Sequence, residues 1–227
     1  MTQIIAHRGA SAAEPENTLP AFRRAVGLGV DGVELDVRRT ADDRLVVHHD
    51  PRLPDGRVIR TTLRDHLPAH VPELDAALEA CDGAFVNLEI KNDPREPDFD
   101  PTDWVAHRTL ALLERRGADA RWLISSFCFE TVQRCRVLSP RLRTAWLVGT
   151  LDDAIVARTV AAGHVAVHPW VDALEEAMVR RAHAAGIAVN TWTCNDPGRM
   201  RELIAWGVDG ICTDVPDVAL AVRRGEV

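Results

Sequence analysis

Two patterns alternate along the chain. Stretches with a helical composition end in Gly, and an apolar run rich in β-branched residues follows each of them, as in "AFRRAVGLGVDGVELDV" and "RRAHAAGIAVNTWT". Gly is the usual residue just past the C-terminus of a helix, so these stretches predict helix-to-strand junctions. The segment "GVDG" occurs at 29–32 and again at 207–210, and each copy leads into a short strand-like run that ends in Asp. One kind of structural unit is therefore repeated.

The apolar runs predict eight main strands, near residues 3–7, 32–38, 84–91, 121–126, 143–148, 164–169, 187–193 and 210–214. Strands that alternate with helices pair in parallel, and at this chain length a closed (β/α)8 barrel is the natural arrangement. We therefore expect an α/β protein with a single TIM-barrel domain over residues 1–227.

A doubly wound open sheet is the alternative fold. It would need a phosphate-binding loop after the first strand, and "GLGVDG" at 27–32 does match G-x-G-x-x-G. These glycines follow a helix and precede a strand, which is the reverse of the order that places a helix N-terminus against a pyrophosphate. We reject this alternative.

Two long polar segments interrupt the regular alternation. After the second strand the chain predicts a short extra strand at 45–48, a loop rich in Pro, Gly and Arg, and a helix near 72–80. The segment "KNDPREPDFDPTDW" follows the third strand. Long loops inside compact domains are usually functional.

Composition and charge narrow the range of partners. The chain is 46% hydrophobic and 27% charged, which is typical of a globular protein with a substantial core. Its 27 basic residues against 34 acidic ones give a net charge of -7, which makes nucleic acid and anionic membrane surfaces poor partners. The start lacks the pattern of a signal peptide, and no segment has the apolar length of a membrane span. We expect no stable membrane insertion.

The cysteines predict a reducing compartment. There are five of them, an odd number, and none forms a CxxC pair. Reduced thiols in the cytoplasm fit this pattern best.

The second strand carries two carboxylates on one face. Side chains alternate along an extended chain, so Glu34 and Asp36 lie on the face opposite to Val33, Leu35 and Val37. A strand with one solvated face would explain this simply, because Asp and Glu are seldom buried unpaired. The rest of the chain has to decide between that explanation and a functional one.

In a parallel barrel the loops at the C-terminal ends of the strands carry the catalytic residues. The unusual polar residues expected at this rim are His7, Arg8, Glu34, Asp36, His49, Asp50, Glu89 and Lys91. Their convergence predicts one site at the barrel mouth.

Three of these residues predict a metal site. Glu34, Asp36 and Glu89 would repel one another in a packed barrel interior unless a counter-ion is present. With oxygen ligands only, one hard divalent cation, Mg2+ or Ca2+ rather than Zn2+, fits them best. The alternative is a network of salt bridges to the nearby basic side chains Arg8, Arg38 and Lys91.

Two histidines predict proton transfer. His7 and His49 are candidates for a general acid and a general base, because imidazole titrates near neutral pH. Arg8 and Lys91 can bind the oxygens of a phosphate. His48 faces the opposite way from His49 and is expected to be a packing or surface residue.

Several segments together resemble the glycerophosphodiester phosphodiesterase family, which has a phosphatidylinositol-specific phospholipase C-like barrel. They are "HRGASAAEPENTLPAF" at 7–22, "GVDGVELDVRRTADDRLVVHHD" at 29–50, "NLEIK" at 87–91, "ISSF" at 124–127, "VNTWTCND" at 189–196 and "GVDGICTDVPD" at 207–217. The resemblance covers nearly the whole chain in the right order. It implies a (β/α)8 barrel and a metal-dependent hydrolysis of deacylated phospholipid diesters.

The resemblance also implies a role for each matched residue. It makes His7 and His49 the acid–base pair, Arg8 and Lys91 the phosphate-binding groups, and Glu34, Asp36 and Glu89 the metal ligands. Trp192 resembles the aromatic residue that lines the substrate pocket, although a core position for this Trp is an equal alternative. Glu16 and Asn17 resemble loop-fixing residues, and Thr18 is a plausible N-cap.

One stretch departs from the family pattern. "HDPRLPDGRVIRTT" spaces Arg60, Thr61 and Thr62 further from His49 than is common, and the sizeable inserted subdomain of larger members is absent here. The shape of the pocket and the preferred alcohol are therefore left open.

The sequence predicts an enzyme that acts on a small molecule. It would hydrolyse glycerophosphodiesters such as glycerophosphocholine and glycerophosphoethanolamine to glycerol 3-phosphate and an alcohol. A lysophospholipase D-like hydrolase would use the same site. A non-catalytic barrel that binds a phosphate or a metabolite is the alternative from a different class, and it would be marked by loss of a histidine or carboxylate, none of which is missing.

Overall fold

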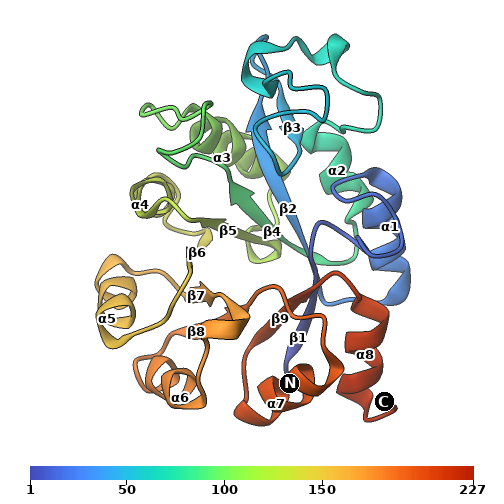
Figure 1. Cartoon of the computed structure of the whole chain (residues 1–227). Coiled ribbons are helices and arrows are strands. Elements are labelled where there is room, and N and C mark those ends of the chain that lie inside the picture. Colours follow the sequence, from blue (N-terminus) through green and yellow to red (C-terminus); the bar gives the residue numbers. More distant parts are fainter.

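A closed parallel barrel forms the centre of the molecule, which the computed structural model describes from residue 1 to residue 227 (Figure 1). Its eight strands are β1 (Gln3–Ala6), β2 (Gly32–Arg39), β4 (Phe85–Ile90), β5 (Trp122–Ser126), β6 (Arg143–Val148), β7 (Ala166–Pro169), β8 (Ala188–Thr191) and β9 (Gly210–Thr213). Each strand pairs in parallel with its neighbour, and β1 closes the barrel by pairing with both β2 and β9. The predicted (β/α)8 barrel is confirmed, with strand ends that differ from the predicted ones by one or two residues.

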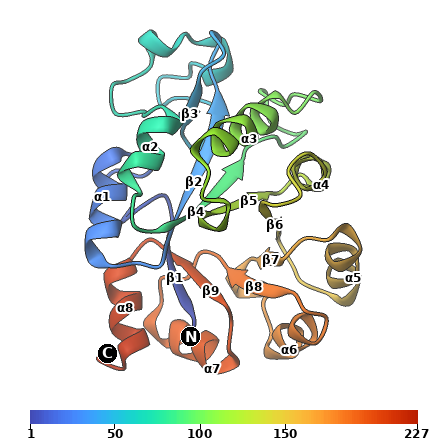
Figure 2. The ribbon, with the colours of Figure 1, turned by 180° about the vertical axis from the view of Figure 1, so that it is seen from behind.

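Helices surround the barrel on the outside, as the two opposite views show (Figures 1 and 2). They are α1 (Leu19–Leu28), α2 (Leu74–Ala80), α3 (Trp104–Arg116), α4 (Phe129–Leu138), α5 (Asp153–Ala162), α6 (Glu176–Ala184), α7 (Pro197–Trp206) and α8 (Pro216–Arg224). The Gly residues that the sequence placed after helices end several of them in the left-handed conformation, such as Gly29 after α1 with φ 80°. The "GLGVDG" segment is thus a helix end followed by β2, as its order in the sequence indicated.

The alternation along β2 separates two environments. Val33, Leu35 and Val37 are fully buried in the large apolar core, which also contains residues of the surrounding helices. Glu34 and Asp36 point to the other face, the interior of the barrel. The interior is closed lower down by a small separate apolar cluster around Leu123, Ala145 and Ala166. The polar face of β2 is therefore buried, which excludes the simple solvated strand.

Two insertions extend the rim of the barrel. β3 (Leu45–Val47) pairs antiparallel with the end of β2, and the loop behind it has its own apolar cluster, which includes Ile59 and Val71. Residues 91–103 form an irregular loop between β4 and α3. The predicted extra strand and long loops are confirmed, and both insertions lie beside the C-terminal ends of β2 and β4.

A glycine after β1 fixes the loop that carries the predicted residues His7 and Arg8. Gly9 has φ +86°, and a Cβ atom there would lie 2.6 Å from the backbone carbonyl carbon of Ala21 in α1. Ala at this position combines left-handed strain with a clash against rigid backbone. We predict that Gly9→Ala lowers the free energy of unfolding by more than about 2 kcal/mol, measured by urea denaturation.

Gly27 provides the matched control for this substitution. It lies inside α1, and a Cβ atom there would have no neighbour within 4 Å. Gly27→Ala should raise the stability by about 0.5–1 kcal/mol, because Gly is less favourable than Ala in a helix. Equal effects of the two substitutions would contradict the steric argument.

Candidate active site

Three carboxylates meet inside the mouth of the barrel. Glu34 and Asp36 come from β2 and Glu89 from β4, where Asp36 and Glu89 are register partners. One carboxylate oxygen from each lies within 4.8 Å of the others, and the residues are only 5%, 1% and 8% exposed. The parallel register of two adjacent strands therefore produces the cluster that the alternation in the sequence suggested.

Burial and mutual repulsion dominate the electrostatics of this cluster. Burial, reinforced by the charge of Asp36, raises the pKa of Glu34 to about 8. Burial also raises the pKa of Glu89, although Lys91 opposes it. Burial works against ionisation of Asp36 too, but Lys91 and Arg8 outweigh it and hold the pKa of Asp36 below its usual range. The cluster is short of positive charge.

The basic neighbours compensate only part of the negative charge. Lys91 Nζ lies 2.7 Å from Glu89 Oε1 and 3.0 Å from Asp36 Oδ1. Arg8 Nε lies 3.5 Å from Asp36 Oδ2, and its backbone N–H donates to Glu34 at 3.0 Å. The salt-bridge network therefore exists around Arg8 and Lys91. Arg38, the third expected member, is absent from it and binds other groups.

The donor set fits a hard divalent cation. Glu34 Oε1 is buried and has no hydrogen-bond partner. If all three carboxylates were ionised, they would face only two cationic side chains, Arg8 and Lys91, and the raised pKa of Glu34 reflects this shortage of positive charge. Carboxylate oxygens are the ligands that Mg2+ and Ca2+ prefer. Glu34, Asp36 and Glu89 could hold one such ion, and their role as ligands stays a prediction.

The "PENT" segment fixes Asp36 and Arg8 in place. Asn17 Nδ2 donates to Asp36 Oδ2 at 2.7 Å, and Asn17 Oδ1 accepts from the backbone N–H of Asp36 at 3.4 Å. Glu16 binds Arg8 Nη1 through both carboxylate oxygens, at 2.9 and 2.8 Å. Thr18 accepts from the Ala21 N–H at the start of α1. Through these contacts Glu16, Asn17 and Thr18 fix the loop between β1 and α1.

His7 is paired with a carboxylate that the sequence did not mark as functional. Its Nδ1 lies 2.7 Å from Asp214 Oδ1, just after β9. Asp214 also accepts from Ser11 Oγ at 3.0 Å and from Asn195 Nδ2 at 2.6 Å. Burial would lower the pKa of His7, but the hydrogen bond to Asp214 and the charge of Glu34 raise it. The repeat that placed Asp214 in the position of Asp36 was the only signal in the sequence.

His49 lies in the opposite electrostatic environment. Burial and the charge of Lys91 lower the pKa of its imidazole. Its Nδ1 lies 2.7 Å from Asp50 Oδ1, so Nε2 is left for other partners, as it is in His7. His48 lines a different surface hollow and contacts the backbone carbonyl of Asp50. The two predicted histidines thus share one cavity and His48 lies outside it.

The cavity at the mouth collects residues from most strands. Its lining includes His7, Arg8, Glu34, His49, Asn87, Glu89, Lys91, Phe127, Leu147, His168, Asn190 and Trp192. The ring of Trp192 packs edge-on against Phe127 with centroids 5.3 Å apart, and its Nε1 donates to the carbonyl of His168 at 2.8 Å. Trp192 therefore lies in the wall of the cavity, and contact with a substrate remains a prediction.

Sequence analysis missed a second polar pair in this cavity. His168 and Asn190 are both buried, and Asn190 Nδ2 lies 3.0 Å from His168 Nε2. Burial lowers the pKa of His168 to about 3, so its imidazole is neutral. A lone His and an Asn within apolar runs carry no pattern that distinguishes them from packing residues.

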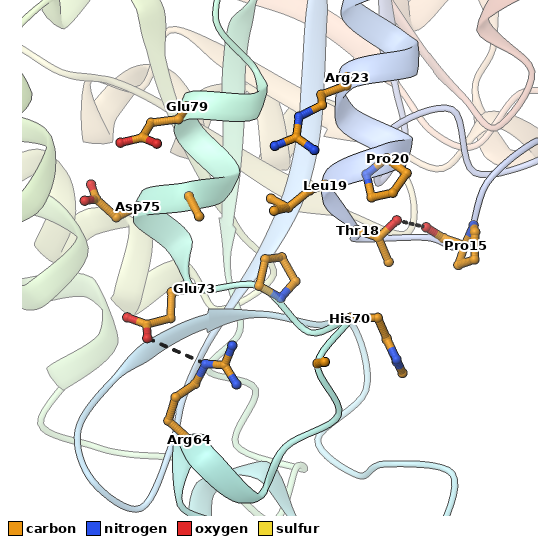
Figure 3. Close-up of a pocket in the computed structure, with 13 residues that line it drawn as sticks. Pro15, Thr18, Leu19, Pro20, Arg23, Arg64, His70, Glu73, Asp75 and Glu79 are labelled. Carbon is orange, nitrogen blue, oxygen red and sulfur yellow. Dashed lines mark hydrogen bonds and ion pairs between the residues drawn. The ribbon is translucent and has the colours of Figure 1, made fainter.

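A larger hollow lies outside the barrel, between the start of α1 and α2 (Figure 3). Its lining includes the charged residues Arg23, Arg64, Glu73, Asp75 and Glu79, and also His70. Arg64 and Glu73 are partners in an ion pair at 3.6 Å. None of the converging residues of the barrel mouth reaches this hollow, so its size alone does not make it the site.

The helices of this protein are too short or too polar for any of them to cross a membrane.

Comparison with known proteins assigns the family. Residues 7–218 match the glycerophosphoryl diester phosphodiesterase family. The chain belongs to this family. It is 29% identical to a glycerophosphodiester phosphodiesterase of Caldanaerobacter subterraneus, over 99% of each chain.

Solved structures have the same fold. A phosphodiesterase of Oleispira antarctica, in complex with the product sn-glycerol-3-phosphate, has a TM-score of 0.91 at 25% identity and covers 99% of this chain and 97% of its own. A glycerophosphodiester phosphodiesterase of Thermotoga maritima has a TM-score of 0.82 at 27% identity, with 99% and 98% covered. The protein is thus an enzyme of the phosphoric diester hydrolase class, as the resemblance implied.

Cation binding should stabilise this enzyme. A ligand that binds only the folded state adds about 2.7 kcal/mol at 100 times its Kd, so Mg2+ or Ca2+ should raise the thermal midpoint. Glu34→Gln and Asp36→Asn should abolish this rise in the thermal midpoint, because each removes one carboxylate ligand and lowers the negative charge that attracts the cation. Differential scanning calorimetry with and without each cation measures it.

Asp153→Asn is the control, because Asp153 is an exposed carboxylate at the start of α5 that pairs only with Arg181. It should keep the full cation-induced shift. Below the raised pKa of Glu34, at about 8, a cation must displace a proton, so affinity should increase as the pH rises toward that value. A shift that survives Asp36→Asn would show that the cation binds elsewhere.

Proposed function

We propose that this enzyme hydrolyses glycerophosphodiesters, such as glycerophosphocholine and glycerophosphoethanolamine, to glycerol 3-phosphate and an alcohol. The observation that carries the proposal is a buried cluster of three carboxylates, with oxygens within 4.8 Å of one another, of which Glu34 and Glu89 line a cavity together with two histidines. The product-bound relative from Oleispira antarctica supports glycerol 3-phosphate as the product.

One divalent cation, Mg2+ or Ca2+, is the proposed cofactor, with Glu34, Asp36 and Glu89 as its ligands. When bound, it would supply positive charge that lowers the pKa of a neighbouring hydroxyl and stabilises charge on the phosphate. Arg8 and Lys91 line the same cavity and would bind the phosphate oxygens. Trp192 would cover the apolar side of the substrate.

The two histidines would divide the proton transfers. The pKa of His49 is lowered and that of His7 is raised, so over a range near neutral pH His49 is neutral and His7 carries a proton. A pair of groups with opposite shifts suits a base and an acid, respectively. Asp214 would hold His7 with Nε2 directed to the substrate. His49 would then accept the first proton and His7 would donate it.

The bond that breaks would be the one between phosphorus and the alcohol oxygen. The 2-hydroxyl of the glycerol moiety loses its proton to His49 and attacks phosphorus, and the alcohol leaves with a proton from His7. A cyclic glycerol phosphate results. Water then opens the ring, gives a proton to His7 and leaves glycerol 3-phosphate after His49 returns its proton. The residues end in their starting states.

Lysophospholipids form a second candidate substrate class. Phe127 is 38% exposed and Trp170 is 44% exposed, and Trp170 lies beside Trp192 through a parallel bridge between their backbones. This aromatic edge could accept an acyl chain on the glycerol moiety. Assay of glycerophosphocholine and lysophosphatidylcholine with the same enzyme preparation compares the two classes.

A cytoplasmic location and a single domain over residues 1–227 are part of the proposal.

Each histidine should be essential. We predict that His7→Ala and His49→Ala lower kcat by roughly 10^2 to 10^4 each, the usual contribution of a general acid or base. His48→Ala should leave kcat within about threefold of the wild-type value, because His48 faces another hollow. Steady-state kinetics on glycerophosphocholine provides the measurement, and equal losses for His48 and His49 would indicate a packing role.

The pH profile gives a second readout of the same assignment. The acid limb should follow His49 and the alkaline limb His7. Asp214→Asn removes the charge that raises the pKa of His7, so the alkaline limb should move to lower pH.

The products identify the bond. We predict that glycerophosphocholine yields choline and glycerol 3-phosphate, and that an analogue without the 2-hydroxyl binds but is not turned over. Phosphorus NMR of the reaction mixture distinguishes glycerol 3-phosphate from phosphocholine. Phosphocholine as the main product would refute the bond assignment, whereas turnover of the deoxy analogue would refute only the cyclic route.

A further inference from the structure

Arg38 is a buried arginine with partners on two loops. It lies on β2, two residues after Asp36, and its side chain is fully buried. Its Nε and Nη2 donate to the backbone carbonyl of His49 at 2.9 and 2.5 Å. Its Nη1 donates to Glu96 at 2.9 Å and to Asp98 at 2.6 Å. The guanidinium therefore connects the loop of His49 to the loop between β4 and α3.

The charge of Arg38 is firmly retained. Burial disfavours the charged form, but Glu96 and Asp98 more than offset it and raise the pKa of Arg38. A planar guanidinium can bind a carbonyl with two N–H groups and still offer others to carboxylates, which an ammonium cannot do in the same geometry. The guanidinium of Arg38 can therefore bind the His49 carbonyl and the carboxylates of Glu96 and Asp98 at the same time.

The side chain of His49 has a weaker support of its own. Its Nδ1 partner is Asp50, whose side chain is 69% exposed. Exposed ion pairs contribute little, because water screens them and two side chains must be ordered. The two hydrogen bonds from the buried Arg38 to the His49 carbonyl constrain the position of the imidazole more strongly.

We propose that Arg38 is a positioning residue for His49, with Glu96 and Asp98 holding the guanidinium against the His49 carbonyl. This inference rests on the proposed function, in which His49 transfers a proton. Arg38 itself belongs neither to the carboxylate cluster nor to the lining of the cavity, and its contact with the lining is the one with the backbone carbonyl of His49. A catalytic group displaced by about 1 Å can lose about 10^2-fold in rate.

Arg39 is a matched control on the same strand. It pairs with Asp43 and with Asp100, which belongs to the same loop as Glu96, and its guanidinium lies 4.0 Å from the centre of the Trp104 ring. It makes no contact with His49. Arg39→Lys therefore tests whether a weaker ion pair between β2 and the loop of residues 91–103 is enough to lower activity.

The experiment is a double-mutant cycle on the full-length enzyme loaded with cation. Arg38→Lys keeps a positive charge for Glu96 and Asp98 but loses the two-pronged bond to the carbonyl. Wild type, Arg38→Lys, His49→Ala and the double variant are assayed on a glycerophosphodiester with a p-nitrophenol leaving group, which keeps slow variants measurable. Cation affinity and thermal midpoint are measured for each.

Arg38→Lys should lower kcat by about 10-fold to 100-fold, with KM and cation affinity within about twofold of wild type. In the His49→Ala background it should lower kcat by less than about twofold, because a residue that acts through an absent group has nothing left to position. Arg39→Lys should leave kcat unchanged within about twofold in both backgrounds.

Equal losses in the two backgrounds, or no loss in either, would overturn the proposal. If Arg38→Lys does not fold, Glu96→Gln carries the same cycle, since its side chain is 29% exposed and it removes one of the anchors of Arg38. A wild-type enzyme that does not hydrolyse glycerophosphodiesters would instead refute the proposed function.

Discussion

The arrangement of the barrel mouth depends on the burial of three carboxylates in one place. Glu34, Asp36 and Glu89 are almost fully enclosed, and burial alone disfavours the charge of each. Such a cluster requires positive charge and hydrogen-bond donors around it. Arg8, Lys91 and Asn17 supply part of this compensation, and each comes from a different loop or strand end.

The same constraint explains why the barrel has a divided interior. The outward faces of the strands pack with the helices in one large core, and a separate apolar cluster of Leu123, Ala145 and Ala166 lies in the barrel. The three carboxylates lie at the mouth of the barrel. A rigid parallel sheet holds the carboxylates at fixed separations there, because register and pleat leave their side chains little freedom.

The loops at the rim of the barrel carry the two histidines. His7 and His49 lie just beyond strand ends, and their neighbours differ: the carboxylates of Asp214 and Glu34 for His7, and the cationic side chain of Lys91 for His49. The inserted segments after β2 and β4 meet at Arg38, so the irregular part of the rim is tied together by one charged side chain. The environments of the two histidines differ because Asp214 and Glu34 are near His7, whereas Lys91 is near His49.

The sequence by itself determined the repeating unit, the parallel barrel and the identity of most candidate residues, since helix-ending glycines and period-two alternation are local signals. It also indicated that Glu34 and Asp36 share a face. Only the tertiary structure decided that this face is buried, that Asp214 pairs with His7, that His168 and Asn190 line the cavity, and that Arg38 binds the loop of His49 instead of the carboxylates. These features depend on contacts between residues far apart in the chain, as with the 207 positions that separate His7 from Asp214, and no local pattern encodes such a distance.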